Sequence, residues 1–120
     1  MRAPLALLAC IVTLAALANA PAIAAYAIAF NPSNGKAAAY NGSFDLETAK
    51  RVALDRCGRG CRIVASGKRS CAAVVESIST GTSAWAVAKG TTRDTAAKSA
   101  WFECRRKGGV NCNTAAAICD

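Results

Sequence analysis

The second half of the chain repeats the pattern of the first half. The repeat is clearest when Cys57 is aligned with Cys104, which gives a period of about 47 residues. The aligned segments are 45–50 with 92–97, 61–65 with 112–116 and, after a shift of one residue, 27–30 with 73–76. Two copies are too few for a solenoid. The pattern therefore predicts one pseudo-two-fold domain with units at about 25–70 and 71–120.

Each unit is expected to form two strands, a helix and a third strand. The first unit predicts a strand at 26–30, a turn at 31–35, a strand at 36–40, a helix at 45–57 and a strand at 61–65. The second predicts a strand at 71–76, a turn at 77–81, a strand at 84–88, a helix at 92–104 and a strand at 112–118. The expected fold class is therefore α+β, an antiparallel sheet of ββαβ units with two helices packed on it.

Local signals support these elements. Large apolar residues alternate with alanines over 26–30, which is typical of a half-buried strand. Asp45 and Thr92 are placed to cap the two helices, because their side-chain oxygens can accept unpaired backbone N–H groups. Alanines recur on the inward helix faces and favour close packing of helix on sheet.

The first 24 residues have the layout of a secretory signal peptide. Arg2 precedes an apolar run that ends in small residues, and the run is short for a membrane span. Cleavage is expected after Ala24, rather than after Ala20, where Pro21 would follow the cut. Residues 7–10 also match a lipobox, with Cys10 as the lipid anchor, but the apolar run continues past that cysteine. We expect an exported protein, periplasmic or secreted, whose mature domain at 25–120 has no transmembrane segment.

An even number of cysteines remains after cleavage, which in a small exported chain indicates disulfides. They are Cys57, Cys61, Cys71, Cys104, Cys112 and Cys119. The repeat suggests Cys57–Cys61 and Cys104–Cys112 within the units and Cys71–Cys119 across the domain, although six cysteines allow fifteen pairings. A metal site fits the spacing poorly, and we expect neither a metal nor a cofactor.

The mature domain is basic. Loss of Arg2 leaves fourteen Lys and Arg against seven Asp and Glu, a net charge of +7. Basic residues follow each helix, and these candidate contacts for an anionic partner are Arg56, Arg59, Arg62, Lys68, Arg69, Arg105, Arg106 and Lys107. If the repeat is structural, they are expected to line one edge. The alternative to a binding role is that these basic residues complement helix C-termini and keep the protein in solution.

Several catalytic systems are excluded by composition. The chain has no histidine, which removes Ser-His-Asp and Cys-His nucleophiles and histidine metal sites. Ser33 and Lys36 match a Ser-x-x-Lys pattern, but in an expected turn rather than at a helix start. Glu76 and Asp120 are the acids outside the helices, and solvated strand ends explain them more simply than a glycosidase pair. We expect no enzymatic activity.

Three segments resemble a bacterial exported family known as domain of unknown function 4189. They are residues 25–30, the helix end at 53–58 with Cys61 close behind, and the strand at 84–88. The resemblance covers nearly all of 25–120, and its six-cysteine spacing is the most specific part. It implies a secreted or periplasmic α+β domain. It implies no activity, so no catalytic residues are carried over.

The leading functional hypothesis is a small exported binding domain for an anionic cell-envelope component or a protein partner. Nucleic acid is disfavoured by export and by the scarcity of aromatic residues for base stacking. The alternative is an inhibitor or immunity-type protein that blocks a secreted hydrolase or toxin. Rigid loops suit that task, and those at 66–70 and 105–111 are the candidates.

Overall fold

The computed structural model describes residues 24–77 and 84–120. The first half contains β1 (Ala25–Phe30), β2 (Ala37–Ser43), α1 (Leu46–Cys57) and β3 (Arg62–Gly67). The second contains β4 (Cys71–Ser77), β5 (Trp85–Gly90), α2 (Arg93–Arg106) and β6 (Cys112–Cys119). Both halves thus run strand, strand, helix, strand, as expected. The expected signal peptide, with Cys10, and most of the turn expected at 77–81 lie outside the described residues.

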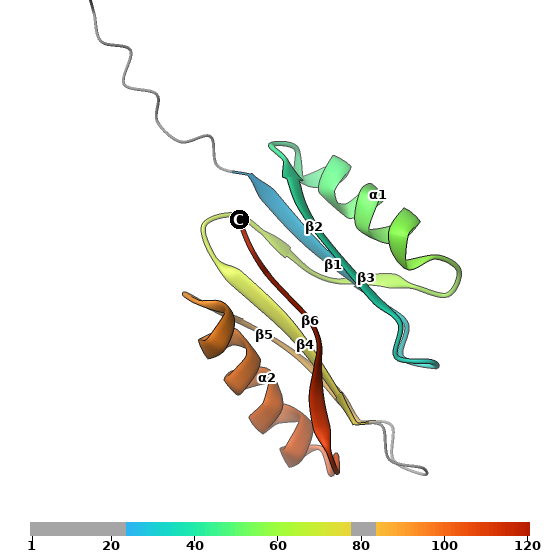
Figure 1. Cartoon of the computed structure of the whole chain (residues 1–120), viewed down its shortest axis with the longest axis vertical. Coiled ribbons are helices and arrows are strands. Elements are labelled where there is room, and N and C mark those ends of the chain that lie inside the picture. Colours follow the sequence, from blue (N-terminus) through green and yellow to red (C-terminus); the bar gives the residue numbers. More distant parts are fainter. Residues whose placement is uncertain (1–23, 78–83) are drawn as a thin grey trace, which may run out of the picture.

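The six strands form two antiparallel sheets rather than a single one. Their orders are β2-β1-β3 and β5-β4-β6, so the first strand of each half is central. One helix covers the outer side of each sheet, and α1 and α2 lie on opposite sides of the molecule (Figure 1). The α+β class is confirmed. The pseudo-two-fold relation between the halves stays a prediction.

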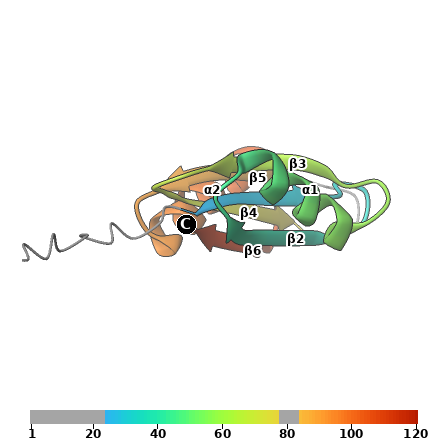
Figure 2. The same cartoon turned by 90° about the horizontal axis from the view of Figure 1, so that it is seen from above.

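The main core lies between the two sheets. From β1 it takes Tyr26, Ile28 and Phe30, and from the other sheet Val74 and Ile118. Viewed from above, β3 and β5 lie along one side and β2 and β6 along the other (Figure 2). On an isolated sheet these apolar side chains would face water. Their burial between the two sheets is the main driving force for sheet packing.

Single side-chain hydrogen bonds join the edge strands of the two sheets. Asn41 Nδ2 of β2 donates to the Cys119 carbonyl of β6 at 2.8 Å. On the other side, Lys89 Nζ of β5 donates to the Ser66 carbonyl of β3 at 2.7 Å. These bonds fix how the two sheets lie against each other at both edges.

The expectation of a half-buried first strand is wrong, because β1 is buried on both faces. Its alanines, Ala25, Ala27 and Ala29, pack against Ala49 and Ala53 of α1. The alternation of large and small residues therefore marks two different buried layers. Large residues fill the space between sheets, and alanines let the helix approach the sheet closely.

The second half is built in the same way. Ala100 and Cys104 of α2 pack against Val75 and Ala86 of the sheet. The backbones approach so closely that a Cβ on Gly90 would lie 2.7 Å from the Ala96 nitrogen. This close packing therefore requires small residues on both the helix and the sheet.

Both predicted helix caps are confirmed. The Asp45 carboxylate accepts from the backbone N–H groups of Glu47 and Thr48. Hydrogen bonds, that from the Thr48 hydroxyl foremost, lower the pKa of Asp45. At α2, Thr92 and Thr95 satisfy each other's backbone N–H groups as a capping box.

The predicted disulfides, Cys57–Cys61, Cys71–Cys119 and Cys104–Cys112, are all present. The expected role of Cys71–Cys119 as a link across the domain needs correction. Cys71 begins β4 and Cys119 ends β6, and the two residues are paired in the same sheet. Every disulfide therefore lies within one half, and the halves are joined by the chain at 68–70 and by non-covalent contacts.

Within the described part of the chain, neither helix is both long enough and apolar enough to span a bilayer.

Candidate functional site

The predicted basic residues gather at opposite ends of the molecule instead of lining one edge. Arg62 begins β3, whereas Lys68 and Arg69 follow its last residue. A strand of six residues spans about 20 Å, so these two groups are well separated. Only part of the predicted set can therefore meet one partner group.

At one end, cations from both halves meet at Trp85. The Arg62 guanidinium lies 5.1 Å from the centre of the Trp85 ring and the Lys107 ammonium 5.8 Å from it. Lys107 also donates to the Trp85 carbonyl at 3.1 Å, and the Phe30 ring packs on the indole at 5.3 Å between centroids. We call Phe30, Arg62, Trp85 and Lys107 the Trp85 cluster.

The topology explains why these residues meet. Arg62 is paired with Phe30 across the β1–β3 ladder, so both side chains leave that ladder side by side. Trp85 belongs to the facing sheet, and Lys107 is the C-cap residue of α2. A cation on the face of an indole is attracted by the negative ring face, and this attraction is strongest for tryptophan.

Two buried polar residues hold the loops next to these cations by hydrogen bonds. Asn31 bonds to the Ser33 N–H at 2.9 Å and to the Arg59 carbonyl at 3.4 Å. Ser77 Oγ accepts from the Val110 N–H at 3.0 Å and donates to the Val110 carbonyl. Asn31 follows β1 and Ser77 ends β4, so each residue ties the loop after the helix to the central strand of its own sheet.

The other predicted basic residues are placed differently. Arg56 lies over Tyr40 at 4.9 Å and Arg105 over Trp101 at 5.3 Å. Arg106 forms an ion pair with Glu103, one turn earlier on α2. Arg56 and Arg105 thus resemble the cations of the Trp85 cluster in being held on aromatic rings.

Glu76 lies at the same end as Trp85, with which it is paired across the β4–β5 ladder. Its carboxylate lies against Gly35, in the first turn of the opposite sheet. Burial raises the pKa of Glu76 above its usual range. Asp120 lies beyond Cys119, at the far end of β6 from the residue that faces Glu76. The two acids therefore do not form a glycosidase pair.

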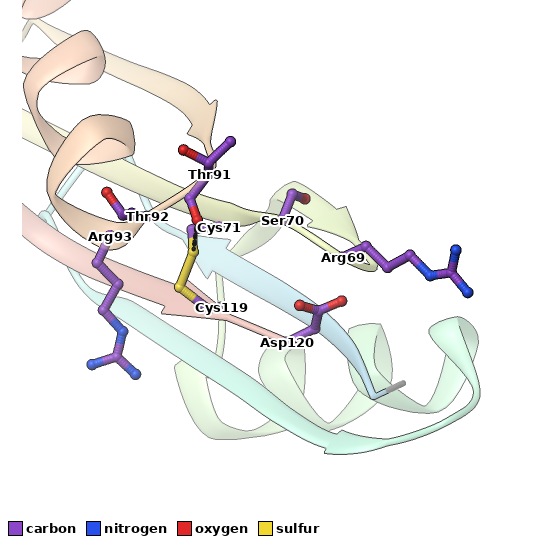
Figure 3. A pocket seen from close by; sticks show the side chains of 8 residues that line it. All are labelled: Arg69, Ser70, Cys71, Thr91, Thr92, Arg93, Cys119 and Asp120. Atoms are coloured by element: carbon purple, nitrogen blue, oxygen red, sulfur yellow. Dashed lines mark hydrogen bonds between the residues drawn. A yellow bond between two sulfur atoms is a disulfide. The ribbon is translucent and has the colours of Figure 1, made fainter. Parts of the chain in front are cut away.

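An open pocket of about 540 Å³ lies at that far end. It surrounds the Cys71–Cys119 disulfide, and Figure 3 shows the side chains of Arg69 and Arg93 extending away from the disulfide, with Asp120 between them. Ser70 and the start of α2 complete the wall. A carboxylate, that of Asp120, thus lies among the cations at this end as well.

The chemistry of the described residues is dominated by disulfides and by cations on aromatic rings. The six cysteines within the described residues are all in disulfides, so none of these offers a thiolate. No group of three potential metal ligands occurs within 24–77 and 84–120. Four aromatic rings, by contrast, hold side-chain cations close to the surface.

Sequence reasoning identified the cations but missed what holds them. Trp85 was interpreted as a strand residue and Asn31 as part of a turn. The available signal was an aromatic residue at the end of β1, Phe30, and another at the start of β5, Trp85, but the repeat does not reveal that both meet the basic residues.

No curated protein and no solved structure matches this chain. A family model matches residues 25–119, which include every described helix, strand and disulfide. By that match the chain belongs to the family described as domain of unknown function DUF4189.

Proposed function

We propose that this chain is an exported, non-enzymatic binding domain that recognises an anionic partner through the Trp85 cluster. The observation that carries the proposal is the meeting of Arg62 and Lys107, from different halves, on one indole ring. The ion pairs of the described residues all lie within a helix, and none includes Arg62 or Lys107. Two positive charges on one ring, neither of them in an ion pair with a described residue, offer an anion a favourable site even though Glu76 lies at the same end.

Pre-organisation supports this site. Disulfides fix the loops on both sides, since Cys61 precedes Arg62 and Cys112 closes the loop that begins at Lys107. Asn31 and Ser77 hold the same loops by hydrogen bonds. Cations that are already held in place lose less entropy when they bind.

Export is supported by the disulfides, because such bonds persist in oxidising compartments. The N-terminal sequence supports the same conclusion, with cleavage after Ala24. That cut would fall directly before β1, which begins at Ala25. The mature chain would then start at the central strand of the first sheet.

The absence of enzymatic activity is supported by the separation of Glu76 from Asp120 and by the oxidised cysteines. The inhibitor alternative receives less support. The loops at 66–70 and 105–111 adjoin opposite ends of the β4–β6 ladder, next to Cys71 and Cys112 respectively. A contact with an enzyme that used both loops would have to extend along the whole β4–β6 ladder.

The proposal is tested by binding of residues 25–120 to immobilised dextran sulfate at low and high salt. Arg62→Gln with Lys107→Gln should weaken binding about tenfold, as expected for two exposed charge contacts. Lys50→Gln with Arg51→Gln on α1 is the matched control, since it removes the same charge elsewhere. Equal losses in both variants, or binding that ignores salt, would reject the Trp85 cluster as the site.

A further inference from the structure

The second helix exposes its largest side chains and buries its smallest ones. Ala96, Ala100 and Cys104 face the sheet. Trp101 and Phe102, by contrast, are 39 % and 65 % exposed, and their rings form an edge-to-face contact at 5.2 Å. A surface helix normally buries its apolar stripe, so this aromatic pair is not explained by the fold.

Positive charge surrounds the aromatic pair. The Arg105 guanidinium lies over Trp101, and no acidic side chain of the described residues pairs with it. Lys98 and Arg106 lie on the same exposed surface, although each also pairs with an acid of the helix. Aromatic rings and an unneutralised cation are thus presented together.

The first helix provides an internal comparison. The positions of α1 aligned with Trp101 and Phe102 hold Leu54 and Asp55. Leu54 is half-buried against the sheet, and Asp55 is an exposed charge. A helix in the same architectural position therefore needs no exposed aromatic pair, which indicates that the pair of α2 has another use.

We propose that this face of α2 binds the surface of a bilayer that contains anionic phospholipids. The inference names the partner class and rests on the proposed preference for anions. Tryptophan and phenylalanine insert at headgroup depth, while neighbouring cations reach the phosphates. The helix itself forms an outer layer of the fold (Figure 1), so a flat surface can reach its exposed side chains.

Other occupants fit less well. A second copy of the domain would bring two charges of +7 together. An acidic protein would need a contact of about 800 Å² on each partner, far more than two aromatic side chains provide. The charge and the small extent of the aromatic surface therefore favour lipid.

The test uses residues 25–120, which contain all described elements, and sedimentation with phospholipid vesicles. Binding to vesicles of phosphatidylglycerol and phosphatidylcholine is expected, with little binding to phosphatidylcholine alone. Trp101→Ala with Phe102→Ala should weaken binding at least about tenfold, and Arg105→Gln about fivefold. Leu54→Ala, which leaves the charge unchanged, is the control on α1 and should have little effect on binding. Thermal unfolding of each variant verifies that it is folded.

Fluorescence adds an independent measurement, because Trp85 and Trp101 are the two tryptophans of the chain. Anionic vesicles should shift the emission of the wild type to the blue, whereas Trp101→Phe should abolish the shift. An unchanged emission, or vesicle binding that survives loss of the aromatic pair, would overturn the inference. Binding to poly-L-glutamate through the pair without binding to vesicles would assign it to an acidic protein instead.

The two proposals fail in different ways. If dextran sulfate binds through Arg62 and Lys107 but no vesicle binds, the lipid inference is wrong and the proposed function stands. If neither probe binds, both are wrong.

Discussion

Neighbouring glycines in the loop after α2 have different structural roles. A Cβ on Gly109 would lie 2.7 Å from the Cys104 carbonyl oxygen and 2.7 Å from both sulfur atoms of the Cys104–Cys112 disulfide. Gly108 has open space around it but a φ of +89°. One position thus needs glycine for packing and the other for backbone conformation.

Alanine substitution should separate these roles. Gly108→Ala is expected to lower the free energy of unfolding by about 1 kcal/mol through backbone strain. Gly109→Ala should cost more, about 2–3 kcal/mol, because neither the disulfide nor the backbone can move aside easily. Urea unfolding of both variants measures the difference, and equal costs would contradict the close packing at Gly109.

The raised pKa of Glu76 predicts an unusual dependence of the free energy of unfolding on pH. Burial raises its pKa in the folded state, so the folded protein binds more protons than the unfolded chain above the ordinary glutamate pKa of 4.5. The contribution of Glu76 to stability is thus most favourable below that value and is lost as pH rises through the folded-state pKa.

Glu76→Gln removes this titration. The variant should gain stability relative to the wild type as pH rises from 4 to 7, as measured by urea midpoints. Asp55→Gln, at an exposed acid on α1, serves as the control for loss of one charge. A wild type whose stability relative to Glu76→Gln rises over the same range would contradict the burial of this carboxylate.

At the scale of the elements, alanine spacing determines how closely each helix approaches its sheet. Ala29 of β1 is fully buried beneath α1, while its cross-strand partner Ala38 lies on an edge strand and is half-buried. Enlargement of the first residue must push the helix outward, whereas the second packs at the half-buried margin of the same cluster, where a larger side chain can extend toward solvent.

Ala29→Leu should therefore destabilise the domain by about 1–3 kcal/mol. Ala38→Leu, the same change on the adjacent strand, should alter stability by less than about 1 kcal/mol. Thermal denaturation of the two variants tests this, and similar melting temperatures would show that the helix–sheet spacing adapts.

Elements could be predicted from the sequence because their signals are local. Asp45 and Thr92 act through groups a few residues away, and Asn-Gly at 34–35 acts within its own turn. The pairing of cysteines was accessible for a similar reason, because the repeat places equivalent cysteines at equivalent helix ends.

The division into two sheets and the position of the cations could not be predicted in this way. Alternation along β1 is the same whether its large side chains face water or a second sheet, and only the packed molecule decides between these states. Arg62 and Lys107 are 45 positions apart in the chain and meet only because the sheets stack. Contacts of this range depend on the whole fold.

At the scale of the whole molecule, the absence of a disulfide between the halves has a direct consequence. The described disulfides lie within residues 57–61 and 71–119, so a cut between Gly67 and Ser70 separates the halves covalently. The core of Tyr26, Ile28, Phe30 and Val74 should still hold them together.

A specific protease site placed between Lys68 and Arg69 tests this arrangement. After cleavage, the two pieces should elute together in size-exclusion chromatography under native conditions. They should separate on a denaturing gel without reductant. Pieces that separate only after reduction would show a disulfide between the halves and would contradict the pairing.

The Cys71–Cys119 disulfide closes the longest loop, 48 residues, and is worth about 4 kcal/mol on the chain-entropy model, against about 2 kcal/mol for Cys57–Cys61. The stability of the fold therefore depends on oxidation of the cysteines, and peptide mapping by mass spectrometry of protein recovered from the periplasm or the medium tests this most directly. The expected result is a chain that starts at Ala25 with Cys57–Cys61, Cys71–Cys119 and Cys104–Cys112 linked. A chain retained in the cytoplasm with six alkylatable thiols would contradict it.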